Sequence, residues 1–509
     1  MSEEAWSMPS NDAIVLSLVA PTPNGLKTVG HSFHPKFTYS IFGEAEEIFG
    51  YQNLQIQLRW HASDLRPNLS ISYSKKFQAV GDTEPVDIEG ALREFLPDSA
   101  FQKKSDWEKA MSNVPQDWTP PGKLIRTFTA PNGTFEVWKG NLADPAVAQL
   151  LNRVQILVPL FIEGGTKINT DEPDADRWTV FFLYQKKELT DSCCTNPYVF
   201  VGYCTVYRFF HFQPPSPPAT PSETKLEEMD QVLRKGDFDL NLLPCRSRIS
   251  QFLVIPPFQQ RGIGTRLYSI IFQDYIQHPQ TVEITVEDPN EAFDDLRDVA
   301  DLHYLRRMPE FRALHLNTGI VLSKNGPAPN NIVDKTAYDA VRAKAKITPR
   351  QFARLVEMHL MSQLPETVRP GIGVEEDNAR GKGKAKVKMP TPEDKHAYRL
   401  WRLLVKKRLY KHNKDALSEL DVEDRVQKLD DTVSSVEFDY ARLLVKAEDQ
   451  AENFEEILPA QPADGFKEKD KAVTNGSPAT NGTGKRKADE DRAVEMASKR
   501  ARVEDADDE

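Results

Sequence analysis

Apolar and polar residues alternate in short runs through the first 330 or so residues of the chain and recur at helical spacing after that. Residues 54–58 alternate with a period of two, which is typical of a half-buried strand. Further runs are rich in aromatic and β-branched residues and predict strands as well. These runs are 178–184, 198–212, 246–255 and 281–287, and the first two are expected to form an antiparallel hairpin.

Helix signals lie between these strands. Asp144 followed by Pro145 places a capping carboxylate before a proline at the first helical position. The glycine pair at 164–165 is expected to end this helix, and Pro159 to kink it. Two more helices are expected over 262–277 and 289–302. Residues 246–302 therefore have the order strand, helix, strand, helix, which predicts a parallel or splayed pair of strands.

Beyond about residue 330 the hydrophobic pattern is helical. The string TPRQ at 348–351 predicts a capping box, and an apolar stripe at 352, 355, 356, 359 and 360 follows it. Another helix is expected to begin at Thr391. A lysine- and glycine-rich insert near 371–390 and the residues after 460 lack apolar periodicity, so both are predicted to be disordered.

These elements predict an α+β protein. We expect an N-terminal mixed α/β domain over 1–140, a central domain over 141–325, a helical C-terminal domain over 326–460 and a disordered tail over 461–509. The proline-rich stretch 213–222 is compatible with an interdomain linker. Strand patterns on both sides of it favour a long loop inside the central domain.

Composition narrows the class of protein. A net charge of −11 over 509 residues argues against a surface that coats nucleic acid and suits a basic protein partner. The four cysteines include no CxxC pair, which predicts a reducing compartment. No apolar run approaches the roughly 20 residues that span a bilayer, and the N-terminus is not a signal peptide, so no membrane contact is expected. The ten histidines form no ligand cluster, so no metal is expected either.

The sharpest chemical signal is the string QQRGIGT at 259–265, between a predicted strand and a predicted helix. Glycines there let backbone N–H groups turn inward, and the helix N-terminus adds partial positive charge, so the loop suits a pyrophosphate. A P-loop needs Lys-Ser or Lys-Thr after its last glycine, and a Rossmann fingerprint needs a third glycine where this chain has Leu267. Neither motif fits, and the pattern QxxGxG remains.

This pattern resembles the acetyl-coenzyme A signature of the GCN5-related N-acetyltransferase (GNAT) fold. The strings SQFLVIPPFQ at 250–259, VEITVEDP at 282–289 and LRD at 296–298 resemble the catalytic subunits of type B histone acetyltransferases. FGE at 42–44, FGY at 49–51 and FIE at 161–163 do so too. The resemblance covers residues 1–320 well and the rest loosely. It implies a GNAT fold for the central domain, acetyl-coenzyme A as a substrate, and no metal.

A lysine amine must lose a proton before it attacks a thioester, so the site needs a base. Glu287 ends its predicted strand, while Asp288 and Glu291 fit the N-cap and third positions of a helix with Pro289 between them. This leaves Glu287 free to act as general base, which is the role that the resemblance implies. The resemblance also makes Glu163 and Asp288 auxiliary catalytic candidates. A surface position for Glu163 and a purely capping role for Asp288 are the alternative interpretations.

The resemblance further implies two sets of binding residues. The backbone of the strand 252–254 would pair with the pantetheine arm and direct an N–H at the thioester carbonyl, although its side chains equally suit a core strand. The residues expected to bind the coenzyme are Phe252, Leu253, Val254, Gln259, Gln260, Arg261, Gly262, Ile263, Gly264, Thr265 and Asn290. The residues expected to contact the protein substrate are Glu44, Ala45, Glu46, Tyr207, Arg208 and Phe209.

Structural roles compete with these assignments. Asn290 also suits a plain position in the first turn of a helix, the aromatic residues suit a hairpin core, and the acidic residues suit a solvated loop. Arg208 departs from the uncharged residue expected beside a lysine-rich tail.

By resemblance, the chain acetylates lysine side chains in the N-terminal tail of newly made histone H4, associated with H3, by direct attack in a ternary complex. A WD40-repeat histone-binding subunit is the implied partner, with no direct nucleic-acid contact. Basic clusters at 485–487 and 499–502 resemble a bipartite nuclear import signal, so cytoplasm and nucleus are both expected, and a solvated charge run is the alternative. Acetylation of protein N-termini or small amines remains a competing hypothesis. So does a histone-binding scaffold, although Gly262, Gly264 and Glu287 argue against it.

Overall fold

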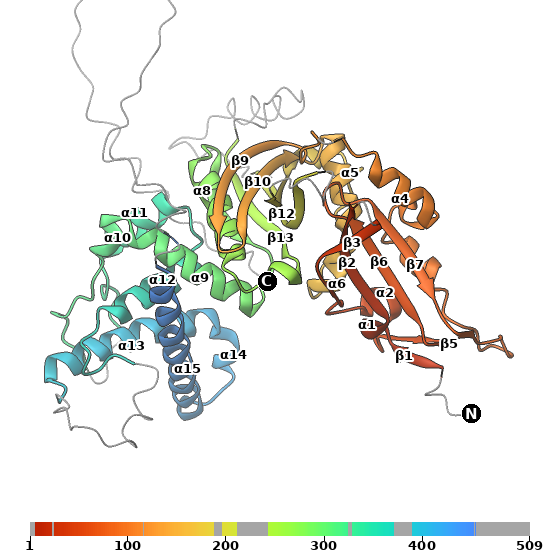
Figure 1. The fold of residues 1–509 in the computed structure, drawn as a ribbon. Coiled ribbons are helices and arrows are strands. Elements are labelled where there is room, and N and C mark those ends of the chain that lie inside the picture. The colour runs from red at the N-terminus through yellow and green to blue at the C-terminus, as the bar shows by residue number, and fades with distance from the viewer. Residues whose placement is uncertain are drawn as a thin grey trace, which may run out of the picture. The chain divides into compact units, whose positions relative to one another are not determined.

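The computed structural model describes residues 6–22, 25–115, 117–187, 196–210, 243–323, 328–370, 389–451 and 454. These residues belong to one compact unit and combine sheets with helices (Figure 1). The proline-rich stretch 213–222, residues 371–388 of the lysine-rich insert and the tail 461–509 with its basic clusters lie outside the described residues. The loop, the disorder and the import signal expected in these segments stay predictions.

The N-terminal part is built on a four-stranded sheet of order β3-β2-β6-β7, in which only β2 and β6 are parallel. The alternation at 54–58 is confirmed, because Ile56 and Leu58 of β6 are buried on one face. The sheet consists of β2 (Ile14–Thr22), β3 (Gly25–Phe33), β6 (Gln55–His61) and β7 (Pro67–Ser72). The smaller elements are β1 (Ser7–Pro9), α1 (Ser10–Ala13), α2 (Tyr39–Phe42), β4 (Glu47–Phe49), β5 (Tyr51–Gln52), β8 (Lys75–Lys76), α3 (Ile88–Arg93), η2 (Asp98–Phe101) and α4 (Lys104–Ser112).

The central part is a six-stranded sheet of order β14-β13-β12-β11-β10-β9. Its strands are β9 (Lys123–Ala130), β10 (Gly133–Asn141), β11 (Trp178–Lys186), β12 (Tyr198–Phe210), β13 (Cys245–Val254) and β14 (Thr281–Val286). The hairpin of β11 and β12 is antiparallel and β13 pairs with β14 in parallel, so both expectations are confirmed. Because β10 pairs with β11, the sheet continues across residue 140, and the division into domains stays a prediction.

The helix at Asp144 begins as expected but does not kink at its proline. The Asp144 side chain accepts the Ala146 N–H at 2.9 Å, and α5 (Pro145–Val154) follows. The chain breaks at 155–156, and α6 (Leu157–Phe161) then carries Pro159 at its third position. The expected kink at Pro159 is therefore wrong, because a proline in a first turn lacks only an N–H that the helix does not use.

The remaining helices cover the end of the central sheet and form the C-terminal part. Figure 1 shows α15 beside α12, and it also contacts α9 and α13. The stripe at 352–360 is buried in α12, as predicted. These elements are η5 (Pro256–Phe258), α8 (Ile263–Gln277), α9 (Glu291–Arg306), α10 (Pro309–Arg312), α11 (Lys335–Ala345), α12 (Pro349–Ser362), α13 (Pro392–His412), α14 (Lys414–Ser418) and α15 (Val422–Asp449). The short turn η3 (Ala175–Arg177) precedes β11.

The capping box predicted at 348–351 is wrong. Within the described residues the Thr348 side chain makes no capping hydrogen bond. Gln351 instead donates its amide to the buried carboxylates of Asp298, at 2.8 Å, and Asp301, at 3.2 Å, on α9. These buried carboxylates need hydrogen-bond donors, so the Gln351 amide binds them and does not complete a capping box with Thr348. The start at Thr391 is confirmed, and it does form a capping box with Asp394.

Candidate active site

The strands β13 and β14 run side by side and then separate. They pair from Cys245 to Ile249 of β13, and the Glu287 N–H extends this ladder by donating to the Ile249 carbonyl at 2.8 Å. The chain then turns away from the sheet, whereas β13 continues to Val254. Beyond Ile249, no strand in the described part of the chain pairs with this edge of β13. An extended ligand can therefore hydrogen-bond to the backbone there, beside Glu287.

The turn after Glu287 differs from the sequence prediction. Asp288 has a φ of 34°, and the N-cap of α9 is Asn290, whose side chain accepts the Phe293 N–H at 2.9 Å. The expected cap at Asp288 is wrong, because the chain needs the whole turn at 288–290 to leave β14 before a helix can begin. Asp288 is thus released from capping, while Asn290 takes that structural role.

The glycine loop lies between η5 and α8. Gly262 has a φ of 68°, a left-handed conformation that favours glycine. A Cβ at Gly264 would lie 3.1 Å from Leu296 Cδ1, so the second glycine permits close packing of α8 on α9. Gln259 Nε2 donates to the Val254 carbonyl at 2.6 Å and ties the loop to the end of β13. In the described structure no side chain caps α8, so its first N–H groups suit an anion.

The other expected coenzyme residues flank this loop. Gln259, Gln260 and Arg261 are exposed, and Phe252 and Thr265 are half-buried. The side chains of Leu253, Val254 and Ile263 are buried in the core, so only their backbone is available to a ligand.

Two residues that the sequence analysis did not single out hold the Glu287 carboxylate. Ser250 donates its hydroxyl to Oε2 at 2.5 Å, and Arg248 Nη2 lies 3.0 Å from Oε1. The Arg248 guanidinium also lies over the Phe209 ring, 4.3 Å from its centroid. The polar alternation of Arg246, Arg248 and Ser250 along β13 was the available signal, because strand alternation puts such residues on one half-exposed face.

The expected substrate residues of β12 divide between two faces. The rings of Tyr207 and Phe209 are 4.6 Å apart, and Trp178 lies 4.8 Å from Tyr207. Tyr207 donates its hydroxyl to Asp174 at 2.8 Å, and burial together with this bond raises the pKa of Tyr207. Alternation directs Arg208 to the opposite face, where it donates to the Asp176 carbonyl at 2.7 Å. Tyr207 and Phe209 thus share a wall with Arg248, and Arg208 does not.

The acidic segment 44–46 lies on the loop after α2. Glu46 Oε1 accepts the backbone N–H groups of Thr38 and Tyr39, and the bond from Thr38 is the main reason that the pKa of Glu46 is lowered. Glu46 therefore caps α2, while Glu44 and Ala45 are exposed. The same helix also contacts the segment that carries Glu163, because the Gly164 N–H donates to the Tyr39 hydroxyl at 2.7 Å. The Glu163 side chain itself is exposed.

Comparison with known proteins identifies the family. Residues 6–163 match the family described as histone acetyl transferase HAT1 N-terminus, and residues 322–365 match the one described as fungal HAT1, C-terminal. A Neurospora crassa protein named histone acetyltransferase type B catalytic subunit is 51% identical, over 99% of both chains. The chain belongs to this family. A protein of the same name from Gibberella zeae is 47% identical, over 98% of this chain and 99% of its own. Another of that name, from Pyricularia oryzae, is 46% identical over 99% of both chains.

Membership of the type B histone acetyltransferase catalytic subunits confirms the resemblance in the sequence and makes the chain an acetyltransferase, an enzyme of the acyltransferase class. Acetyl-coenzyme A is the substrate that this class of reaction implies. The roles of individual residues rest on the geometry above and stay predictions.

The two cysteines of this acetyltransferase that the structure describes, Cys204 and Cys245, are buried, and burial raises the pKa of both thiols. Cys193 and Cys194 lie outside the described residues. Among the residues that the structure describes, no three His, Cys, Asp or Glu side chains are grouped to hold a metal ion. No helix in the same residues has the length and apolar character needed to cross a bilayer.

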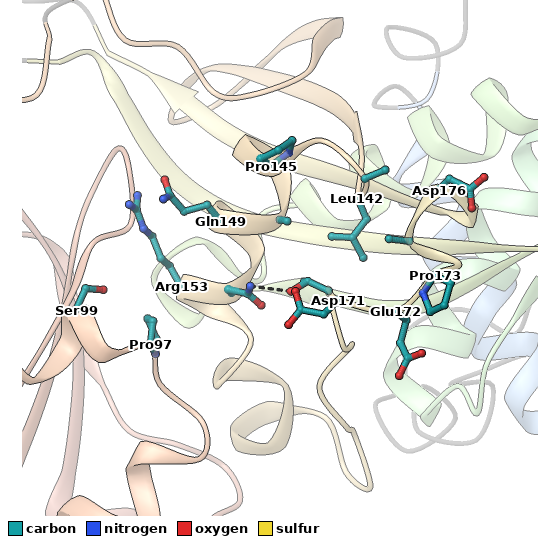
Figure 2. Close-up of a pocket in the computed structure, with 15 residues that line it drawn as sticks. Pro97, Ser99, Leu142, Pro145, Gln149, Arg153, Asp171, Glu172, Pro173 and Asp176 are labelled. Atoms are coloured by element: carbon teal, nitrogen blue, oxygen red, sulfur yellow. Dashed lines mark hydrogen bonds between the residues drawn. The ribbon is translucent and has the colours of Figure 1, made fainter.

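A groove of about 790 Å³ opens beside α5 (Figure 2). Exposed carboxylates of Asp171, Glu172 and Asp176 lie on one side of it, and Pro97 and Pro145 on the other. Its one lining arginine, Arg153, is already bound to Asp64 through the main-chain carbonyl at 2.5 Å. None of the predicted catalytic, coenzyme or substrate residues lines this groove.

Proposed function

We propose that the protein transfers acetyl from acetyl-coenzyme A to lysine side chains in the N-terminal tail of newly synthesised histone H4, before its assembly into nucleosomes. The observation that carries this proposal is the edge of β13 between Glu287 and the glycine loop, with which none of the described strands pairs. Strands β9 to β13 are antiparallel, and β14 is parallel to β13 after the crossover through α8. This order supports the GNAT fold for the central part.

The residues present fit the coenzyme. The backbone of Phe252 to Val254 can pair with the extended pantetheine arm, and the uncapped N-terminus of α8 with Gly262 can bind the pyrophosphate. The exposed Gln260 and Arg261 border that position. The coenzyme supplies an activated acetyl thioester, and the protein supplies the amides that orient it and polarise its carbonyl.

Glu287 is the proposed general base. Its side chain is 35% exposed at the end of β14, so a substrate amine can reach it. The lysine ammonium gives one proton to the carboxylate, and its nitrogen then forms the amide bond with the acetyl carbon while the carbon–sulfur bond breaks. The second proton that the nitrogen loses goes to the thiolate, so coenzyme A leaves as the thiol. Glu163 and Asp288 are the auxiliary acidic candidates. Burial of Cys204 and Cys245 supports direct attack rather than transfer through a cysteine.

A basic, flexible tail suits the surroundings of this base. Tyr207, Phe209 and Trp178 provide an aromatic wall, and Glu44 adds an exposed carboxylate on the loop after α2. The relatives are named histone acetyltransferases, which supports this substrate class. The proposal includes association with H3, a WD40-repeat partner subunit, and action in cytoplasm and nucleus, all of which rest on the sequence resemblance.

The test is mass spectrometry of core histones incubated with acetyl-coenzyme A and the pure protein, followed by kinetics on an H4 tail peptide. Glu287→Gln should lower kcat by about 10²–10⁴-fold, which is the usual contribution of a positioned base. Glu283→Gln is the matched control, because Glu283 lies on the same strand and pairs with Arg246, and it should keep kcat within about twofold of wild type.

Two outcomes would contradict the proposal in different ways. Full activity of Glu287→Gln across a pH series would remove Glu287 as the base. Faster acetylation of N-terminal peptides or polyamines than of histone tails by the wild type would replace the substrate and leave the coenzyme site standing.

A further inference from the structure

Arg248 is the one cation that the described structure pairs with Glu287. Its Nη2 lies 3.0 Å from Glu287 Oε1, and its guanidinium rests on the Phe209 ring at 4.3 Å. Its Nε is buried and has no hydrogen-bond partner within the residues that the structure describes. Arg248 thus connects the aromatic wall of the substrate side to the carboxylate that is proposed to take the proton.

The two oxygens of this carboxylate are held from different sides. Ser250 donates to Oε2, and Arg248 pairs with Oε1, while the Glu287 N–H fixes the backbone against β13. A glutamate at a strand end otherwise rotates about three side-chain bonds. Each carboxylate oxygen has two lone pairs, so both keep an acceptor position for an incoming proton.

Arg246 provides an internal comparison on the same strand. It lies two residues before Arg248 and pairs with Glu283 at 3.0 Å, so β13 and β14 carry two arginine–glutamate pairs in succession. Both arginines are about equally exposed, at 40% and 35% of the side chain. The pair of Arg248 differs because its carboxylate lies where the strands separate and its arginine is stacked on Phe209.

We propose that Arg248 is a positioning residue for acetyl transfer: held flat by Phe209, it fixes the orientation of the Glu287 carboxylate toward the substrate amine. This inference rests on the proposed role of Glu287. Misplacement of a reacting group by about 1 Å can cost about 100-fold in rate, so a residue that only orients the base can have a large effect on kcat.

The test is a double-mutant cycle on an H4 tail peptide at saturating acetyl-coenzyme A. Arg248→Met should lower kcat by about 10- to 100-fold, leave the acetyl-coenzyme A dissociation constant from calorimetry unchanged, and change KM little. In the Glu287→Gln background the same substitution should change kcat by less than about twofold, because the group that it orients is gone. Arg246→Met is the matched control and should keep wild-type kcat in both backgrounds.

Arg248→Lys keeps the test valid if Arg248→Met is unstable, because it retains a cation on the strand. It should lose about 3- to 10-fold in kcat, since an ammonium lacks the planar guanidinium that stacks on Phe209 and meets the carboxylate. Full kcat for Arg248→Met, or the same loss in both backgrounds, overturns the inference alone. Full kcat for Glu287→Gln overturns the base assignment and this inference with it.

Discussion

Arg408 on α13 donates three hydrogen bonds to the buried carboxylate of Glu357 on α12, from Nε to Oε1 at 2.8 Å and to Oε2 at 3.0 Å, and from Nη2 to Oε2 at 2.9 Å. Tyr440 on α15 donates to the same carboxylate at 2.8 Å, and Glu357 is only 2% exposed. Side chains from three C-terminal helices, α12, α13 and α15, therefore meet at one buried carboxylate, and both of its oxygens accept hydrogen bonds. Since α12 and α15 also pack on α9, this charge supports the helix that follows the proposed base.

Breaking this pair from one side should destabilise the protein strongly. Arg408→Met leaves the Glu357 carboxylate buried with Tyr440 as its one donor among the described side chains. Removing one partner of a buried pair costs about 3–5 kcal/mol of the free energy of unfolding. Urea unfolding at pH 7 measures this loss. Combining Arg408→Met with Glu357→Met should recover most of it, because neither member of this pair is then left as an unpaired buried charge. A double variant no more stable than Arg408→Met would contradict the explanation.

The free energy of unfolding should also depend on pH, through protonation of His359 in α12. Burial and the nearby Arg306 lower the pKa of His359 to about 4, against about 6.5 in an unfolded chain. Between these values the unfolded chain binds more protons, so the free energy of unfolding falls as pH is lowered from about 6.5 toward 4. At pH 5 this one group costs about 2 kcal/mol relative to pH 7.5.

His359→Phe isolates this contribution. The ring of His359 packs 4.6 Å from that of Phe311, so an aromatic replacement keeps the packing and removes the titration. Urea unfolding at pH 5 and pH 7.5 should show that the variant loses about 2 kcal/mol less than wild type over this interval. An equal loss in both proteins would mean that His359 does not titrate as its burial requires.

The glycine loop gives a prediction for the coenzyme. Gly262→Ala places a side chain in a left-handed conformation, which costs about 1–2 kcal/mol, and its Cβ would lie 3.0 Å from Arg266 Nη1. The loop should shift, and calorimetry should show acetyl-coenzyme A binding weakened by about tenfold or more. Gly81→Ala is the control. Gly81 has a similar φ of 61° with nothing within 4 Å of a Cβ, so it should lose similar stability and keep full affinity.

Much of the fold follows from local patterns in the sequence. The alternation at 54–58 and the aromatic runs of β11 and β12 predicted strands because one face of each is buried, and Asp144 with Pro145 fixed the start of α5. The caps expected at Asp288 and Thr348 failed for different reasons. The chain uses residues 288–290 as a turn that leaves β14, so the cap falls on Asn290. At Thr348 a tertiary interaction replaces the local one, because the carboxylates of α9 accept the Gln351 amide.

The candidate site could be predicted only in part. Glu287 and the glycine loop carry recognisable motifs, but the pairing of Glu287 with Arg248 depends on the register of two parallel strands that are far apart along the chain. No local pattern specifies that register, because it depends on how the chain folds back through α8, which connects the two strands and contacts both of them. The separation of Arg208 from its two aromatic neighbours follows from strand alternation, once the three are assigned to one strand.

The second residue that holds the base gives the last prediction. Ser250→Ala removes the hydrogen bond to Glu287 Oε2, while Arg248 still pairs with Oε1, so kcat on an H4 tail peptide should fall by about tenfold, less than for Glu287→Gln. Ser247→Ala is the control on the same strand. It loses a buried hydrogen bond to Thr281 at 2.9 Å, which should cost about 1 kcal/mol of stability and leave kcat unchanged. Equal kcat for the two variants would mean that the Ser250 hydroxyl does not orient the carboxylate.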